Sequence, residues 1–229
     1  MYVLHYVPDN ASLIVRLALE EAGLPYEARL VDRRARQHEG EDFRRLNPAG
    51  LIPALETPEG PLSETGAILL WLADRHPEAR LAPPVHAPDR GEFLRWLFFL
   101  SNTAHADLRQ LFYPDQYVPQ ASIAGHHAIL ATRMRRHFTL LNAAAASHPA
   151  LFAPPSALML YTAALMRWAV LYPRGQARWF RASDQLSLAA AAMALEERPA
   201  ALAVAAAEGL GEAPFTRPTE PRPPEGPAF

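Results

Sequence analysis

A short polar run, Ser63-Glu64-Thr65, stands directly before the amphipathic segment 68–73. Residues of this kind cap helix starts, where unpaired amides and the positive end of the helix dipole favour a carboxylate ligand. The hydroxyl of Thr65 would add a donor to that carboxylate, and Glu64 would hold a cationic amine beside it. The pair therefore fits an amino-acid zwitterion. The structural alternative is that the run only caps the helix.

A proline lies just ahead of this run. Ile52-Pro53 precedes the apolar pair Ala54-Leu55, and because proline cannot donate to a strand ladder it indicates an edge position or a bend. The sequence leaves the isomer of the Ile52–Pro53 bond open, since cis is the minority form. Thr57-Pro58-Glu59-Gly60 predicts a tight reversal between antiparallel strands. Residues 46–74 are thus predicted to form loop, strand, turn, strand and helix.

The order of residue types in this stretch is also that of a known family. N-P-x-G-x-x-P-A-L, a turn, and S-E-T-x-A-I-x-x-W-L-A resemble the glutathione-binding half of the glutathione S-transferases. The resemblance implies that the backbone of Ile52, before Pro53, holds the cysteinyl part of glutathione. It further implies that Glu64 and Thr65 hold the γ-glutamyl end, with glutathione as co-substrate.

The chain before this stretch supplies the elements that must position it. Residues 2–6 and 26–31 are predicted strands, and the helical spacing from Ser12 to a glycine cap at Gly23 places a helix between them. Strand, helix and strand make a βαβ unit with parallel strands. Residues 1–76 therefore follow the βαβ-ββα order of a thioredoxin-like domain.

The chain after it is predicted to be helical. The proline-rich segment 77–89 is interpreted as a linker, residues 90–210 as an all-α C-terminal domain, and 211–229 as a Pro-rich tail, either disordered or extended over the domains. The predicted fold class is α/β plus all-α. Five helices are predicted in this part. The first starts at Asp89, which caps it, the second runs over 122–146, and the third runs from Leu158 to Val170 with Ser156 as its cap. The fourth starts at Ser183 or Asp184, and the fifth spans 199–209. The third is apolar all round and belongs in the middle of a bundle.

Three further segments, residues 17–27, 96–112 and 198–210, resemble helices and a strand of the same family, in particular of its bacterial beta-class members. Two departures accompany this resemblance. Ala11 takes the place of the beta-class cysteine, which excludes a mixed disulfide with glutathione there. Met159 stands where the family usually has an aspartate that completes the capping box with Ser156.

The resemblance implies that the protein stabilises the glutathione thiolate, for which one good hydrogen-bond donor and a helix N-terminus suffice. The candidate donors are Tyr6, Asn10 and Ser12, although Tyr6 also fits core packing and Ser12 an ordinary helix cap. His105 matches a histidine that faces the active site in beta-class enzymes. A lone helix histidine is otherwise a satisfied core or surface residue.

The remaining candidates are cations and aromatic residues. Arg34 and Arg36 are candidates for the glycyl carboxylate of glutathione, or else belong to a solvated face. The electrophile would bind between the domains. The candidate lining residues, which fit a bundle core equally well, are Phe98, Ser101, Phe112 and Tyr113, beside His105.

Composition excludes several other functions. The chain has no cysteine, so disulfides, thiolate metal sites and thiol-disulfide exchange are excluded, and with them a thioredoxin-like oxidoreductase. A net charge of −2 and a pI near 6.5 give no nucleic-acid footprint. No leader and no membrane span is recognised, no metal site is expected, and a cytoplasmic homodimer is the expectation. Two hypotheses remain, a transferase acting on small hydrophobic electrophiles and a non-catalytic ligand-binding or interaction protein of the same fold.

Overall fold

The computed structural model describes residues 1–175 and 178–224. Its N-terminal part is a four-stranded sheet of order β2-β1-β3-β4. β1 runs parallel to β2 and antiparallel to β3, and β3 is antiparallel to β4. The strands are β1 (Tyr2–Tyr6), β2 (Tyr26–Leu30), β3 (Ala54–Thr57) and β4 (Gly60–Ser63). This arrangement confirms the predicted thioredoxin-like order of elements.

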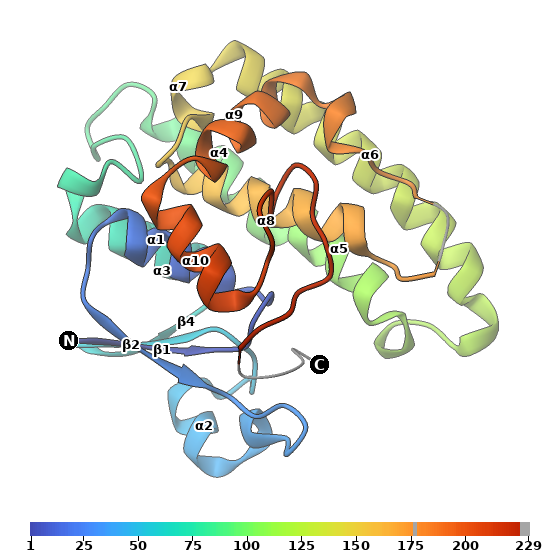
Figure 1. Ribbon diagram of the computed structural model, residues 1–229, viewed down its shortest axis with the longest axis horizontal. Helices are drawn as coiled ribbons and strands as arrows, with labels where there is room; N and C mark the ends of the chain where they lie inside the picture. The colour runs from blue at the N-terminus through green and yellow to red at the C-terminus, as the bar shows by residue number, and fades with distance from the viewer. Residues whose placement is uncertain (176–177, 225–229) are drawn as a thin grey trace.

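Three helices accompany the sheet: α1 (Ser12–Glu21), α2 (Glu41–Leu46) and α3 (Thr65–Arg75). Figure 1 shows α1 and α3 on one side of the sheet and α2 on the other. The apolar stripe of α1, which includes Leu13, Ile14 and Leu17, is fully buried, and each such side chain contributes about 1.5–3 kcal/mol to folding. Because α1 also contacts the C-terminal helices α8 (Ala157–Leu171) and α10 (Pro199–Glu208), it joins the sheet to the helical region.

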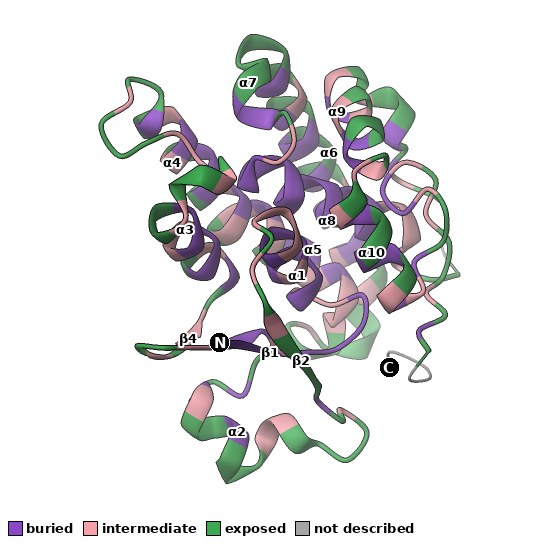
Figure 2. Cartoon of the chain, turned by 60° about the vertical axis from the view of Figure 1, so that its left-hand side comes forward, coloured by how far each residue is buried: buried purple, intermediate pink, exposed green. Residues whose placement is uncertain are grey.

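The helical region is built around α8, which Figure 2 shows in the colour of buried residues. Every residue from Ala157 to Ala169 is buried, which confirms the predicted central helix. Ser156 caps it, accepting from the Leu158 amide at 3.3 Å and donating to the Leu151 carbonyl at 2.6 Å. The helices are α4 (Arg90–Phe99), α5 (His105–Phe112), α6 (Ile123–Ser147), α7 (Pro149–Phe152), α8 (Ala157–Leu171), α9 (Leu186–Glu196) and α10 (Pro199–Glu208).

One predicted helix cap and one predicted helix start are wrong. Asp89 precedes α4, but its side chain makes no capping bond, because its backbone (φ −89°, ψ 0°) is not in the extended conformation of an N-cap. α9 begins at Leu186 and not at Ser183 or Asp184, which lie in a 3₁₀ turn. The amides of Ser187 and Leu188 both donate to Asn142 Oδ1 of α6, at 2.9 and 3.2 Å. The N-terminus of α9 is therefore capped by a side chain from another helix.

A π-helical turn, Leu100–Ala104, connects α4 to α5, where the sequence predicts one continuous helix. Such a turn adds a residue to the helix and changes the direction in which later side chains point; π turns are frequent at functional sites. The side chains that follow, His105 and Arg109, line the cavity described below.

The proline-rich tail packs on the helical region through residue 224. Phe215 is fully buried, its amide donates to Glu196 Oε1 at 2.8 Å, and the Arg222 amide donates to the Gly209 carbonyl at 2.8 Å. A Cβ at Gly209 would lie 2.0 Å from the Arg222 carbonyl oxygen, so glycine is required there. Of the two expectations for the tail, the extended one holds for residues 211–224; 225–229 lie outside the described residues.

Candidate active site

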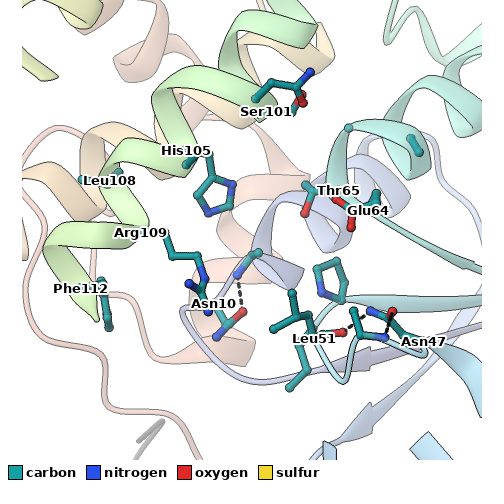
Figure 3. A pocket seen from close by; sticks show the side chains of 18 of the residues that line it. Asn10, Asn47, Leu51, Glu64, Thr65, Ser101, His105, Leu108, Arg109 and Phe112 are labelled. Carbon is teal, nitrogen blue, oxygen red and sulfur yellow. Dashed lines mark hydrogen bonds between the residues drawn. The ribbon is translucent and has the colours of Figure 1, made fainter. Parts of the chain in front are cut away.

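A cavity of about 840 Å³ lies between the thioredoxin-like part and the helical region. Its walls are the loop before α1, the 47–53 loop, the first turn of α3, and one side of α4 and α5. Figure 3 shows His105 and Arg109 on α5 facing Thr65, Glu64 and Leu51 across it. Residues from both halves of the chain therefore meet in one cleft.

The 47–53 loop presents an unpaired backbone edge to this cavity. The Ile52–Pro53 bond is cis, and β3 begins only at Ala54, whose partner is His5. The peptide groups of Ile52 thus lie beyond the end of the ladder. Asn47 holds the loop, donating from Nδ2 to the Leu51 carbonyl at 2.6 Å and accepting from the Ala49 amide at 3.1 Å. An extended peptide ligand can pair with such an edge.

The first turn of α3 forms the opposite end of the cleft. Glu64 precedes the helix with an unusual backbone (φ 69°, ψ 111°), and its carboxylate makes no capping bond. The capping alternative for Glu64 is therefore wrong, because the exposed side chain faces the cavity instead. The first-turn amides, Thr65 to Ala67, have no partner within the helix. This end combines an anion, a hydroxyl and amide donors.

Gly66 brings this turn against the helical region. A Cβ at Gly66 would lie 3.2 Å from Ser101 Cβ, which is tighter than ordinary van der Waals contact. The glycine thus allows α3 to approach the π turn closely. The contact brings the first turn of α3 next to the π turn that precedes α5.

The three candidate thiolate donors are separated by the structure. Asn10 lines the cavity, where its Oδ1 accepts from the Ala11 amide at 2.6 Å. Ser12 is fully buried, donates to the Val7 carbonyl at 3.0 Å and accepts from the Val7 amide at 3.2 Å. Tyr6 is buried in the core, with Arg16 over its ring. Neither Ser12 nor Tyr6 lines the cavity. The core-packing alternative holds for Tyr6, but the helix-cap alternative for Ser12 is wrong, because the N-cap of α1 is Ala11 and the Ser12 hydroxyl bonds to Val7 instead.

His105 lies in the wall of the cavity within a polar chain. Its Nδ1 is 2.9 Å from the hydroxyl of Tyr161, and Tyr161 is also hydrogen-bonded to Thr65. Burial and, to a smaller extent, the positive charge of Arg109 lower the pKa of His105 to about 4. Burial also raises the pKa of Tyr161, with Glu64 adding to the effect. Both groups are therefore neutral at pH 7, and the chain joins the two ends of the cleft.

We expect the imidazole of His105 to stay neutral down to about pH 4 in the folded protein. The unfolded histidine takes up a proton near pH 6.5, so between these values the unfolded state binds more protons and stability falls as the pH falls. The wild type should lose about 3 kcal/mol relative to H105Q between pH 7 and 4. NMR titration of the His105 ring checks the pKa directly. A midpoint near 6.5 would contradict it.

The two arginines predicted to bind the glycyl carboxylate of glutathione are not among the residues that line this cavity. Arg36 does not line this cavity, and it is exposed and ion-paired with Glu39. Arg34 does not line this cavity either. The arginines that do are Arg33, Arg44 and Arg109. Of these three arginines, only Arg109 could have been predicted from sequence spacing, because it follows His105 by one helical turn and lies on the same helix face.

The four predicted electrophile-pocket residues do line the cavity: Phe98, Ser101, Phe112 and Tyr113. Phe98 is 53% exposed, which fits an open rim better than a bundle core. The structure adds Trp168, Tyr161 and Leu108, which sequence reasoning missed. Within the described residues no cluster of three histidines, aspartates or glutamates could hold a metal, and no helix is long and apolar enough to cross a membrane.

Comparison with known proteins agrees with this geometry. The family "Glutathione S-transferase, N-terminal domain" matches residues 11–75. Glutathione S-transferase GST-4.5 of Xanthomonas campestris is 32% identical over 141 residues, covering 61% of this chain and 68% of that protein. Glutathione S-transferase GstA of Escherichia coli O157:H7 is 34% identical over 114 residues, covering 49% of this chain and 57% of that protein.

Solved structures extend the likeness over both halves. A sphingomonad glutathione S-transferase complexed with glutathione superposes with a TM-score of 0.72 at 29% identity, covering 88% of this chain and 96% of that one. A glutathione transferase homologue from Sulfitobacter with bound glutathione gives 0.76 at 23% identity, over 89% and 96%, and supports the fold alone. The sequence relatives and the cleft between sheet and helices lead to one conclusion: this chain belongs to the glutathione S-transferase family.

Proposed function

We propose that the protein is a glutathione transferase that activates the glutathione thiol for attack on a small electrophile. The observation that carries the proposal is the juxtaposition in one cleft of a free backbone edge at Ile52 with Glu64 and Thr65 at a helix N-terminus. The edge would pair with the cysteinyl residue, Glu64 would accept the γ-glutamyl amine, and the Thr65 turn would bind its carboxylate.

The glycyl end of glutathione would lie beside Gly50. A Cβ there would be 3.0 Å from the His38 carbonyl oxygen and 3.8 Å from Arg44 Nε, and Gly50 has the positive φ of 65° that glycine adopts without cost. Arg44 is exposed and lines the cleft, so its guanidinium is available to a carboxylate. This assignment replaces Arg36 by Arg44.

The direct test is calorimetric titration with glutathione and with S-hexylglutathione. Micromolar to millimolar binding, tighter for the hexyl compound, would support both the peptide site and an adjoining apolar pocket. Absence of binding by either would contradict the proposal and favour the second candidate, a non-catalytic ligand-binding protein. That candidate draws on the absence of cysteine and of an accessible serine or tyrosine hydroxyl at the Asn10 loop.

Asn10 and the start of α1 are the proposed source of thiolate stabilisation. Asn10 is the one sequence-predicted donor in the cavity wall, and the positive end of the α1 dipole adds to its effect. We expect Asn10→Asp, which has the same shape but a negative charge, to raise the pKa of bound glutathione by about one unit. Thiolate absorbance against pH measures this shift. Asn10→Ser is the neutral control, and equal pKa values in all three proteins would contradict the role.

Action on a small hydrophobic electrophile, assembly as a homodimer and a cytoplasmic role in detoxification also belong to this proposal. They follow from the family resemblance, and the apolar rim at Phe98 and Phe112 supports a hydrophobic part of the electrophile.

A further inference from the structure

The cleft continues behind Tyr113 into a second hollow of about 640 Å³. The two hollows share the lining residues Arg33, His38, Glu39, Phe112, Tyr113 and Gln116. The second is lined in addition by three arginines, Arg34, Arg36 and Arg174. Among its described lining residues the only acid is Glu39. This end of the cleft is therefore rich in positive charge, in contrast to the Glu64 end.

Two guanidinium groups lie against the ring of Tyr113, a residue that lines both hollows. Arg33, from the loop after β2, has its Cζ 5.6 Å from the centre of the tyrosine ring and donates from Nη1 to the hydroxyl at 2.9 Å. Arg109, from α5, has its Cζ 5.2 Å from the same ring. Cation–π contacts of this kind orient a guanidinium without neutralising it. One arginine comes from each half of the chain.

The other partners of these two arginines are neutral. Arg109 donates to Gln116 Oε1 at 2.9 Å and to the hydroxyl of Tyr117. Within 1–175 and 178–224 no carboxylate lies within 4.0 Å of either guanidinium, whereas Arg36 and Arg174 pair with Glu39 and Glu220. Two half-buried cations that are held beside the same tyrosine but are not ion-paired favour an anion next to them. Figure 3 shows Arg109 reaching from α5 toward Asn10, the proposed donor to the thiolate.

We propose that Arg33 and Arg109 form an anion subsite in the electrophile half of the cleft, so that the preferred electrophiles carry a carboxylate. The inference rests on the proposed function and narrows its substrate class. In the displacement of an aryl chloride, the thiolate forms the C–S bond while the C–Cl bond breaks and chloride leaves with the bonding electrons. The carboxylate takes no part in this exchange and only orients the ring.

Binding of two glutathione conjugates tests the subsite without requiring turnover. S-(4-Carboxybenzyl)glutathione and S-(4-carbamoylbenzyl)glutathione differ only in the charge of one substituent. We expect the wild type to bind the carboxylate about tenfold more tightly, as for a charge-assisted hydrogen bond, and to lose this preference as salt rises. Arg109→Gln and Arg33→Gln should abolish it. Arg95→Gln, an exposed arginine on α4 that pairs with Glu92, is the matched control and should retain it.

Two results would overturn the inference alone. One is equal affinity of the wild type for both conjugates, and the other is an unchanged preference in R109Q. If the wild type binds neither conjugate, the proposed function fails and this inference with it. The two failures are therefore distinguishable.

The glycyl carboxylate is the other possible anion, and a second arm separates it. The same pair of benzyl conjugates is made from γ-glutamylcysteine, which lacks the glycine. If R33Q then binds like the wild type, Arg33 binds the glycyl carboxylate and the two-arginine subsite is overturned. If R33Q still loses the preference for the carboxybenzyl compound, the subsite is supported.

Turnover provides an independent measure. We expect kcat/KM for 4-chloro-3,5-dinitrobenzoate, divided by the rate constant of its uncatalysed reaction with glutathione, to exceed the same ratio for the neutral amide, 4-chloro-3,5-dinitrobenzamide. R109Q should bring the two ratios together while R95Q leaves them apart. A wild-type ratio that favours the benzamide would contradict the subsite.

Discussion

Glu64→Gln is expected to weaken glutathione binding about tenfold to a hundredfold. Glutamine keeps the length and shape of the side chain but removes the charge that would meet the γ-glutamyl amine. A hydrogen bond to a charged group contributes about 1.5–3 kcal/mol, and 1.4 kcal/mol corresponds to a factor of ten in affinity. Because Glu64 makes no capping bond in the free protein, its loss should leave the helix and the stability of the fold nearly unchanged.

Calorimetry with glutathione measures this effect, and thermal unfolding of the same samples verifies the fold. Glu59→Gln is the matched control: Glu59 is an exposed acid of the β3–β4 turn that pairs with Arg75, and it does not line the cavity. Glutathione affinity should be unchanged in E59Q. Equal affinity of E64Q and wild type would remove the assignment of the γ-glutamyl site.

Arg167→Met is expected to lower the free energy of unfolding by about 3–5 kcal/mol, because it leaves a buried carboxylate without its counter-ion. Arg167 and Asp9 are both inaccessible to solvent and form a bidentate pair, with Nε–Oδ1 and Nη2–Oδ2 distances of 2.8 and 2.9 Å. Trp168 Nε1 also donates to Asp9 Oδ1 at 2.8 Å. The same guanidinium donates to the carbonyl of Leu210, just before the tail, and to two tail carbonyls, those of Pro214 and Thr219.

This pair links the tail to the candidate active site, because Asp9 directly precedes Asn10. Asp9 has a positive φ of 52°, an uncommon conformation that its buried contacts maintain. R167M should therefore both release the tail and alter the Asn10 loop. We expect chymotrypsin to cut after Phe215, which is fully buried in the wild type, and transferase activity to fall with it.

Denaturant unfolding and mass spectrometry of the digest check these effects. Arg136→Met, at an exposed position on α6, should leave stability and digestion unchanged. Asp9→Asn combined with R167M removes both charges and should recover part of the lost stability, since an isolated buried charge is the main cost. Wild-type stability in R167M would show that the pair contributes little and would contradict the linkage.

The parts of the fold that the sequence predicted are those encoded by near neighbours in the chain. Strand alternation, helical spacing and the turn at Thr57-Pro58-Glu59-Gly60 depend on residues within one or two turns of each other. The order of elements and the apolar centre at α8 followed from them. Ile52-Pro53 and Glu64-Thr65 could also be singled out from their near neighbours, because their proposed roles depend on backbone geometry at a strand end and a helix start.

Other features were decided by tertiary contacts. Ser12 and Asn10 are equally plausible donors in sequence, but packing of the loop turns the Ser12 hydroxyl to the Val7 carbonyl and leaves Asn10 in the cavity. The start of α9 depends on Asn142, more than forty residues earlier. Arg167 lies in an apolar helix, and only the approach of Asp9 and the tail gives its charge a partner.

The distribution of arginines shows the same division. Composition and spacing indicate a highly charged segment over residues 33–45, but they do not distinguish Arg33, which reaches Tyr113 just after α5, from Arg36, which pairs locally with Glu39. Local sequence determines which groups are present and on which element, because backbone preferences act over short range. Which of these groups meet across the cleft depends on how the helical region packs on the sheet, and only the tertiary structure decides that.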